Sequence, residues 1–139
     1  MGVWVRRDYL LLVTALIEVG TGLSLMILPS IPFALLLDVS QPGRETIFIG
    51  RIAGAALFSI GSNSWLARGH KPGRALRGLL ISVLIYDALA AGLLVYAGLV
   101  LGTIGIMLWP AVVVHSALAG WCAMCLWVLT KQVAEIASK

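Results

Sequence analysis

Four long apolar stretches constrain this chain more than any other feature. They cover about residues 9–28, 46–67, 76–99 and 104–130, and charged or turn-forming residues bound each of them. A helix needs about 20 mostly apolar residues to cross a bilayer, so each stretch is long enough to span. With 139 residues in all, little remains for an extramembrane domain. The sequence therefore predicts an all-α polytopic membrane protein, with one transmembrane domain over residues 1–139 folded as a four-helix up-down bundle.

The composition agrees with this class. Hydrophobic residues make up 60% of the chain and charged residues 12%, whereas soluble domains average about 45–50% and about 25%. The net charge is +4, but the basic residues flank the apolar stretches and form no binding face, so no nucleic-acid partner is expected. The sequence contains no phosphate-binding glycine loop, no HExxH motif and no nucleophile elbow, and it identifies no cofactor.

The distribution of positive charge predicts the orientation. Eight of the ten Lys and Arg residues fall at the N-terminus, between the second and third apolar stretches, or at the C-terminus. The positive-inside rule places these three regions in the cytoplasm, so we expect a cell-membrane protein with both termini cytoplasmic. An even number of crossings agrees with this orientation. The eight residues are Arg6, Arg7, Arg68, Lys71, Arg74, Arg77, Lys131 and Lys139.

The two outer connections differ in character. Residues 29–43 contain Ser30 followed by Pro32, a pattern typical of a helix N-cap with proline in the first turn, and they end in Gln-Pro-Gly at 41–43. This predicts a short interfacial or partly re-entrant helix between the first two spans. Residues 97–105 contain three glycines and no charge, which predicts a tight hairpin between the last two spans.

Three ionisable residues are expected near the bilayer midplane. Counting about 1.5 Å per residue puts Glu18, Asp87 and His115 at similar depths on three different spans. A charged side chain at the bilayer centre costs about 2.5–3.5 kcal/mol or more, so each needs a partner or a function. In an up-down bundle the fourth helix contacts both the first and the third, so the three side chains can converge on one pocket. Two neighbouring carboxylates at low dielectric do not both ionise easily, so one is protonated or a cation is shared.

This pattern describes a proton, metal or polar-ligand site. The alternative is that Glu18, Asp87 and His115 each bond separately to neighbouring helices and fix their register. Arg51, near the outer end of the second span, can snorkel or pair with an outer acid, and it can also receive an anionic headgroup or a substrate carboxylate.

A CxxC pair at Cys122 and Cys125 stands alone in the chain. Thiol redox chemistry in the membrane needs further cysteines to pass electrons onward, and a metal site would need two more soft ligands, so no resident metal is expected here. The pair is typical of small, polarizable core residues.

Several short motifs resemble those of small four-helix bacterial membrane proteins of the DoxX-like group. They are Glu18-Val-Gly-Thr-Gly22, Gly50-Arg-Ile-Ala-Gly54, Tyr86-Asp87-Ala-Leu, and the run from Leu108-Trp-Pro to His115. The resemblance implies a four-helix bundle in a bacterial cytoplasmic membrane, and it carries no established activity.

Three functions remain open at this stage. The first is a ligand-binding or accessory subunit that holds a lipid-like or small polar molecule near Glu18, Asp87 and His115. The second is a small proton- or ion-coupled transporter that uses the midplane acids. The third is a membrane enzyme acting on a lipid or isoprenoid, with a carboxylate as general acid or base beside His115. Small residues at helical spacing suit close packing of helices, and we expect membrane lipids and a homo-oligomer or larger membrane complex as partners.

Overall fold

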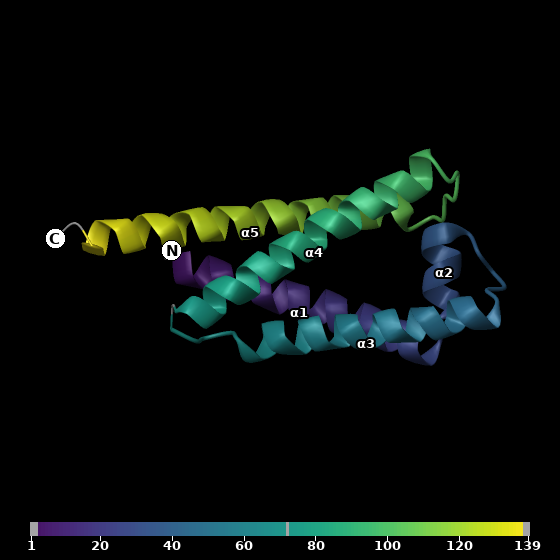
Figure 1. Ribbon diagram of the computed structural model, residues 1–139, viewed down its shortest axis with the longest axis horizontal. Coiled ribbons are helices and arrows are strands. Elements are labelled where there is room, and N and C mark those ends of the chain that lie inside the picture. Colours follow the sequence, from purple (N-terminus) through teal and green to yellow (C-terminus); the bar gives the residue numbers. More distant parts are fainter. Residues whose placement is uncertain (1–2, 72, 138–139) are drawn as a thin grey trace.

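The described part of the chain consists of helices joined by short loops, and it contains no strand. The computed structural model describes residues 3–71 and 73–137, with side chains over 7–71 and 73–131. Within these ranges the chain forms α1 (Val3–Ile27), α2 (Ser30–Leu37), α3 (Arg44–Leu66), α4 (Arg74–Leu99) and α5 (Leu108–Ala137) (Figure 1). The predicted all-α class is confirmed.

Three helices are long and apolar enough to cross a membrane. These segments are Arg7–Ile27 in α1, Arg74–Leu99 in α4 and Leu108–Lys131 in α5. Helix α3 covers the second predicted span but is not one of these three. Arg51 and the polar run at 62–64 lower its hydropathy.

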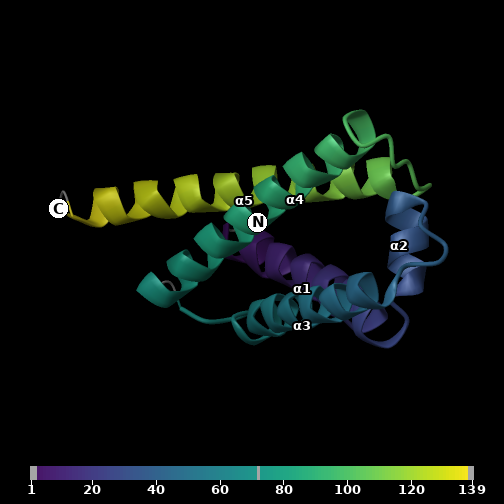
Figure 2. The same ribbon diagram turned by 45° about the vertical axis from the view of Figure 1, so that its right-hand side comes forward.

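The long helices form two pairs. Helix α1 packs along α3, and α4 packs along α5; α5 also contacts α1, whereas α3 and α4 make few contacts. Figures 1 and 2 show α4 crossing α5 at an angle while α1 and α3 run side by side. The buried apolar core lies where α1, α4 and α5 meet, and its members are Leu10, Leu11, Leu76, Leu80, Val83, Leu118, Cys122 and Cys125.

Glycines set the close packing of α1 against α3. A Cβ on Gly22 would lie 2.7 Å from the Gly54 carbonyl oxygen, and a Cβ on Gly54 would lie 2.7 Å from the Gly22 carbonyl oxygen. A Cβ on Gly61 would lie 2.8 Å from the backbone nitrogen of Val19. Lipid tails give helices no hydrophobic reason to associate, so such backbone contact supplies the attraction through van der Waals packing.

Helix α2 differs in detail from its prediction. Ser30 was expected to be the N-cap, but Pro29 holds that position and Ser30 is the first helical residue. The helix ends at Leu37 because Asp38 adopts a left-handed conformation, with φ of 58°. A short polar side chain tolerates this conformation. The stop therefore precedes the expected Gln-Pro-Gly, and Gly43 is instead the N-cap of α3.

The connection between α4 and α5 binds α2. The Gly105 N–H donates to the Leu36 carbonyl at 3.2 Å, and the Met107 N–H donates to the Leu35 carbonyl at 2.8 Å. The last span was expected to start at residue 104, but α5 begins at Leu108 because residues 105–107 are engaged with α2 in this way. The predicted hairpin between the last two long helices thus also satisfies carbonyl groups that the C-terminus of α2 leaves unpaired.

The glycine contact predicts opposite effects for two neighbouring substitutions. Gly22→Ala should lower the free energy of unfolding by about 1–3 kcal/mol, because the methyl group meets backbone atoms that cannot easily move. Gly20→Ala, on the same helix, has nothing within 4 Å of its added Cβ and should be neutral or raise stability by up to about 1 kcal/mol. Unfolding titrations in mixed detergent micelles measure both. Equal effects would contradict the proposed contact.

Candidate functional site

Helical spacing carries Asp87 into the interior. On α4 the buried residues Leu76, Leu80, Val83 and Asp87 follow one another at intervals of four, three and four. Residues at such intervals lie on one face of a helix. Asp87 therefore continues the face that packs in the core.

The same arithmetic applies to α1 and α5. On α1 a buried face runs from Arg7 through Thr14 to Glu18, with exposures of 3%, 0% and 1%. On α5, His115 precedes the buried Leu118 and Cys122 at intervals of three and four. Glu18, Asp87 and His115 thus each lie at one end of a row of buried residues on their helix.

The structure brings the three predicted site residues together. One ligand atom from each of Glu18, Asp87 and His115 lies within 4.8 Å of the others. His115 Nδ1 and Asp87 Oδ1 form a hydrogen bond of 2.7 Å that joins α5 to α4. We call this group the acid–histidine cluster. The three side chains thus meet at one polar point among α1, α4 and α5, and the Asp87–His115 bond also links two of these helices, as the second alternative describes.

The cluster is enclosed and incompletely satisfied. Asp87 is 0% exposed and Glu18 is 1% exposed, while the His115 side chain retains 13%. Within the described residues, Glu18 Oε1 and Asp87 Oδ2 have no hydrogen-bond partner. Leaving a buried polar atom unpaired costs about 1–3 kcal/mol, and more for a charged group. These two oxygens are therefore available to a proton, a cation or a small donor.

Tyr86 belongs to the same centre and was not predicted as a site residue. Its ring contacts the His115 ring edge to face, with centroids 5.7 Å apart and planes at 83°. Its hydroxyl group also lies within interaction range of the Glu18 carboxyl group. A tyrosine in the middle of a span needs a partner for its hydroxyl, and this need was the signal that could have marked it.

Two buried hydroxyls extend the polar interior. Thr14 lies one turn before Glu18 on the same face of α1, and Ser64 follows the buried glycines of α3. Neither hydroxyl oxygen has a hydrogen-bond partner in the part of the chain that the structure describes. The four-residue spacing to Glu18 could have identified Thr14, whereas nothing in the sequence singles out Ser64.

Arg51 stands apart from the cluster. Its side chain is exposed on α3 and, as far as the described residues go, pairs with neither Asp38 nor Glu45. The suggested contact with an anionic headgroup therefore stays a prediction.

The CxxC residues lie in the core. The Cys122 thiol donates to the Leu80 carbonyl oxygen at 3.1 Å, and Cys122 and Cys125 are not joined in a disulfide bond. Cys122 thus links α5 to α4 at a point seven residues after His115 on α5.

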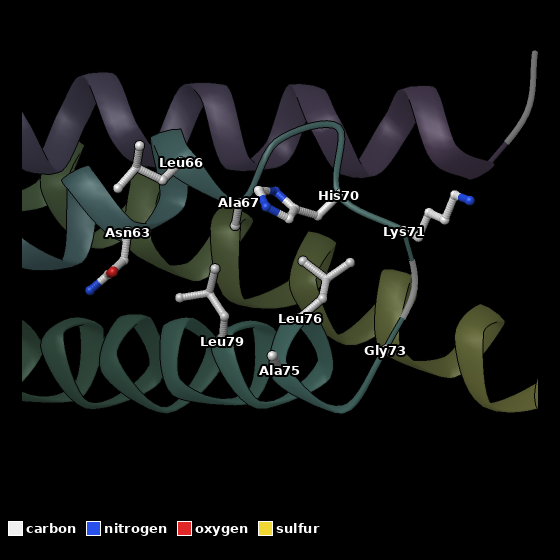
Figure 3. Close-up of a pocket in the computed structure, with 9 residues that line it drawn as sticks. All are labelled: Asn63, Leu66, Ala67, His70, Lys71, Gly73, Ala75, Leu76 and Leu79. Atoms are coloured by element: carbon white, nitrogen blue, oxygen red, sulfur yellow. The ribbon is translucent and has the colours of Figure 1, made fainter.

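Cavities lie elsewhere in the described part of the chain, and two of them are lined by α3. One of about 360 Å³ opens between α3 and α4 beside the loop at 67–73, with Asn63, His70 and Leu79 in its wall (Figure 3). The other, of about 540 Å³, is an apolar groove between α1 and α3 that includes Ala15 and Trp65. No member of the acid–histidine cluster lines either cavity. A molecule bound in either of these two cavities would therefore not contact the acids.

Comparisons with known proteins returned no match. This holds for the scan against protein-family models, for the search of curated proteins and for the search of solved structures. The resemblance to the DoxX-like group therefore stays a prediction, and the functional argument depends on the site itself.

The Asp87–His115 hydrogen bond can be tested by stability. His115→Ala should lower the free energy of unfolding by about 3–5 kcal/mol, because it leaves a buried carboxylate without its partner. Adding Asp87→Asn to this variant should recover part of the loss, since the amide carries no charge. His70→Ala, in the exposed loop, serves as control. A double variant as unstable as the sum of its single changes would contradict the pairing.

Proposed function

We propose that this chain is a four-span membrane protein that works as a ligand-binding subunit and holds a small cation or polar ligand in the acid–histidine cluster. One observation carries the proposal: two enclosed carboxylates, each with an unpaired oxygen, lie within 4.8 Å of each other and of a histidine nitrogen. Packing alone does not account for such a group, because polar residues inside a membrane domain are costly unless they are paired or used.

The arrangement of the chain supports four crossings. The Gly69 N–H donates to Asp8 Oδ1 at 3.3 Å, which ties the loop between α3 and α4 to the start of α1. Helix α2 and the α4–α5 loop lie at the opposite end (Figure 1). In this arrangement α3 is the second crossing, with its buried glycine face against α1, and α2 lies at the outer interface. The basic loop and the N-terminal end of α1 share the cytoplasmic side.

The subunit role is tested by what the protein retains. Native mass spectrometry of protein extracted gently from its own membrane should show a bound small ligand that Glu18→Gln abolishes, because the substitution removes one of the two carboxylates. Glu45→Gln, which removes a carboxylate from the exposed start of α3, should leave the ligand in place. The same spectra report the oligomeric state and any copurified partner.

Two results would count against the subunit role. One is a ligand-free mass for the wild-type protein and both variants; the other is a ligand that survives Glu18→Gln.

A second candidate is a proton- or ion-coupled transporter, and the buried polar face of α1 favours it. Arg7, Thr14 and Glu18 run from the inner end of α1 to the cluster at intervals of seven and four residues, and all three are buried. Such a file could connect the cluster to the cytoplasmic side, as polar chains do in membrane pumps.

Transport predicts flux. In liposomes containing a pH-sensitive dye, the wild-type protein should carry proton-linked flux that Glu18→Gln reduces to the level of protein-free vesicles, because the midplane carboxylate is removed from the path. Thr14→Val should slow the flux, and Glu45→Gln should not. Wild-type vesicles that behave like empty ones would leave the subunit role as the better reading.

A further inference from the structure

We propose that the acid–histidine cluster is a binding site for one divalent first-row transition-metal ion, with Glu18, Asp87 and His115 as its protein ligands. This inference rests on the proposed function, and it names the ligand. The sequence left this group open as a proton, metal or polar-ligand site and assigned it no resident metal, and the inference now commits to a metal ion.

The charge of the cluster matches a dication. Two carboxylates in an enclosed, low-dielectric place carry two negative charges when ionised, and one divalent ion neutralises both. Arg51 is exposed on α3, and the salt bridge in which Asp87 takes part has His115 as its partner.

The donor set selects the class of ion. One imidazole nitrogen with two carboxylate oxygens suits zinc, manganese, iron or cobalt, whereas sites for calcium or magnesium are built from oxygen alone. The three ligands come from α1, α4 and α5. Binding therefore closes a link among three helices.

The spacing is close to that of a loaded site. Ligands about 2.1 Å from a tetrahedral ion lie about 3.4 Å apart. The separations here run from the 2.7 Å hydrogen bond to an upper limit of 4.8 Å. An ion would push the hydrogen-bonded pair apart and draw the third ligand inward, which side-chain rotation can supply. Within the cluster, Glu18 Oε1 and Asp87 Oδ2 have no hydrogen-bond partner among the described residues, so both can turn toward an ion.

Tyr86 supplies an outer contact. Metal-binding carboxylates are usually held in place by further hydrogen bonds, and changing such an outer partner costs about 10–100-fold in affinity. Tyr86 fits this description, because its ring packs edge to face on His115 and its hydroxyl group lies within interaction range of the Glu18 carboxyl group. It is a positioning residue and not a ligand.

Binding through Nδ1 displaces the hydrogen that lies between Nδ1 of His115 and Oδ1 of Asp87. In a neutral imidazole this hydrogen moves to Nε2, whereas a protonated imidazole or a protonated carboxyl group releases its proton to solution. Because the metal competes with protons for these ligand atoms, affinity falls as pH falls. The 13% exposure of the His115 side chain marks the least enclosed side of the site.

Manganese provides a direct test. Protein purified without a histidine tag, stripped with a chelator and returned to detergent should bind one Mn²⁺ per chain, seen as loss of the EPR signal of free Mn²⁺. Glu18→Gln should weaken binding more than about 100-fold, beyond what an outer contact costs, and Tyr86→Phe should weaken it about 10-fold. Glu45→Gln should bind as the wild type does. Zn²⁺ should displace Mn²⁺, since affinity rises toward the end of the series.

A measurement on the wild type alone covers the case in which variants fail to fold. Pulsed EPR of bound Mn²⁺ should show modulation from a coordinated imidazole nitrogen, as His115 is a ligand in this proposal. No binding, binding of several ions without nitrogen modulation, or equal affinity in Glu18→Gln would overturn the metal assignment. If native mass spectra still show another ligand that Glu18→Gln removes, only the metal assignment fails; if they show none, the proposed function fails with it.

Discussion

The hydrogen bond between His115 and Asp87 is the constraint on which the interior of this protein depends. Asp87 has no exposed surface and lies in the middle of a long apolar helix. A carboxylate in that position is tolerated only with a partner, and His115 supplies it at 2.7 Å. The bond fixes how α4 and α5 align along their axes. Glu18 then reaches the same point from α1, so three helices share one register.

The two helix pairs are held together by different means. Glycines bring the backbones of α1 and α3 into contact, and this close approach replaces the hydrophobic drive that lipid tails cannot provide. In contrast, α1, α4 and α5 meet through larger side chains such as Leu10, Leu80 and Leu118, with the polar cluster one turn or more beyond them. The loop before α5 is fastened to α2 by backbone hydrogen bonds. Glycine packing therefore joins α1 to α3, the polar hydrogen bond joins α4 to α5, and backbone hydrogen bonds join α2 to the loop before α5.

The sequence predicted the helices and the membrane class because both depend on apolar runs and local turn residues. It also predicted that Glu18, Asp87 and His115 could meet, since depth along a helix follows from counting residues. It did not predict the left-handed turn at Asp38 or the contact of Gly105 with Leu36, because distant backbone groups decide both. The role of Tyr86 was missed for a related reason: the sequence gives a side chain's depth, whereas its partners depend on how neighbouring helices rotate.

The modest hydropathy of α3 has a consequence for how the chain enters the bilayer. Helices α1, α4 and α5 contain the segments that are long and apolar enough to cross a membrane, and α3 is less hydrophobic than these. If α3 crosses, as proposed, contact with a neighbouring span would assist its insertion, and α1 precedes it along the chain. The glycine face that joins the two helices would then act during biogenesis as well as in the finished fold. Residues such as Gly22 and Gly54 would decide whether the second span is accepted at all, and thus which side of the membrane every later segment faces.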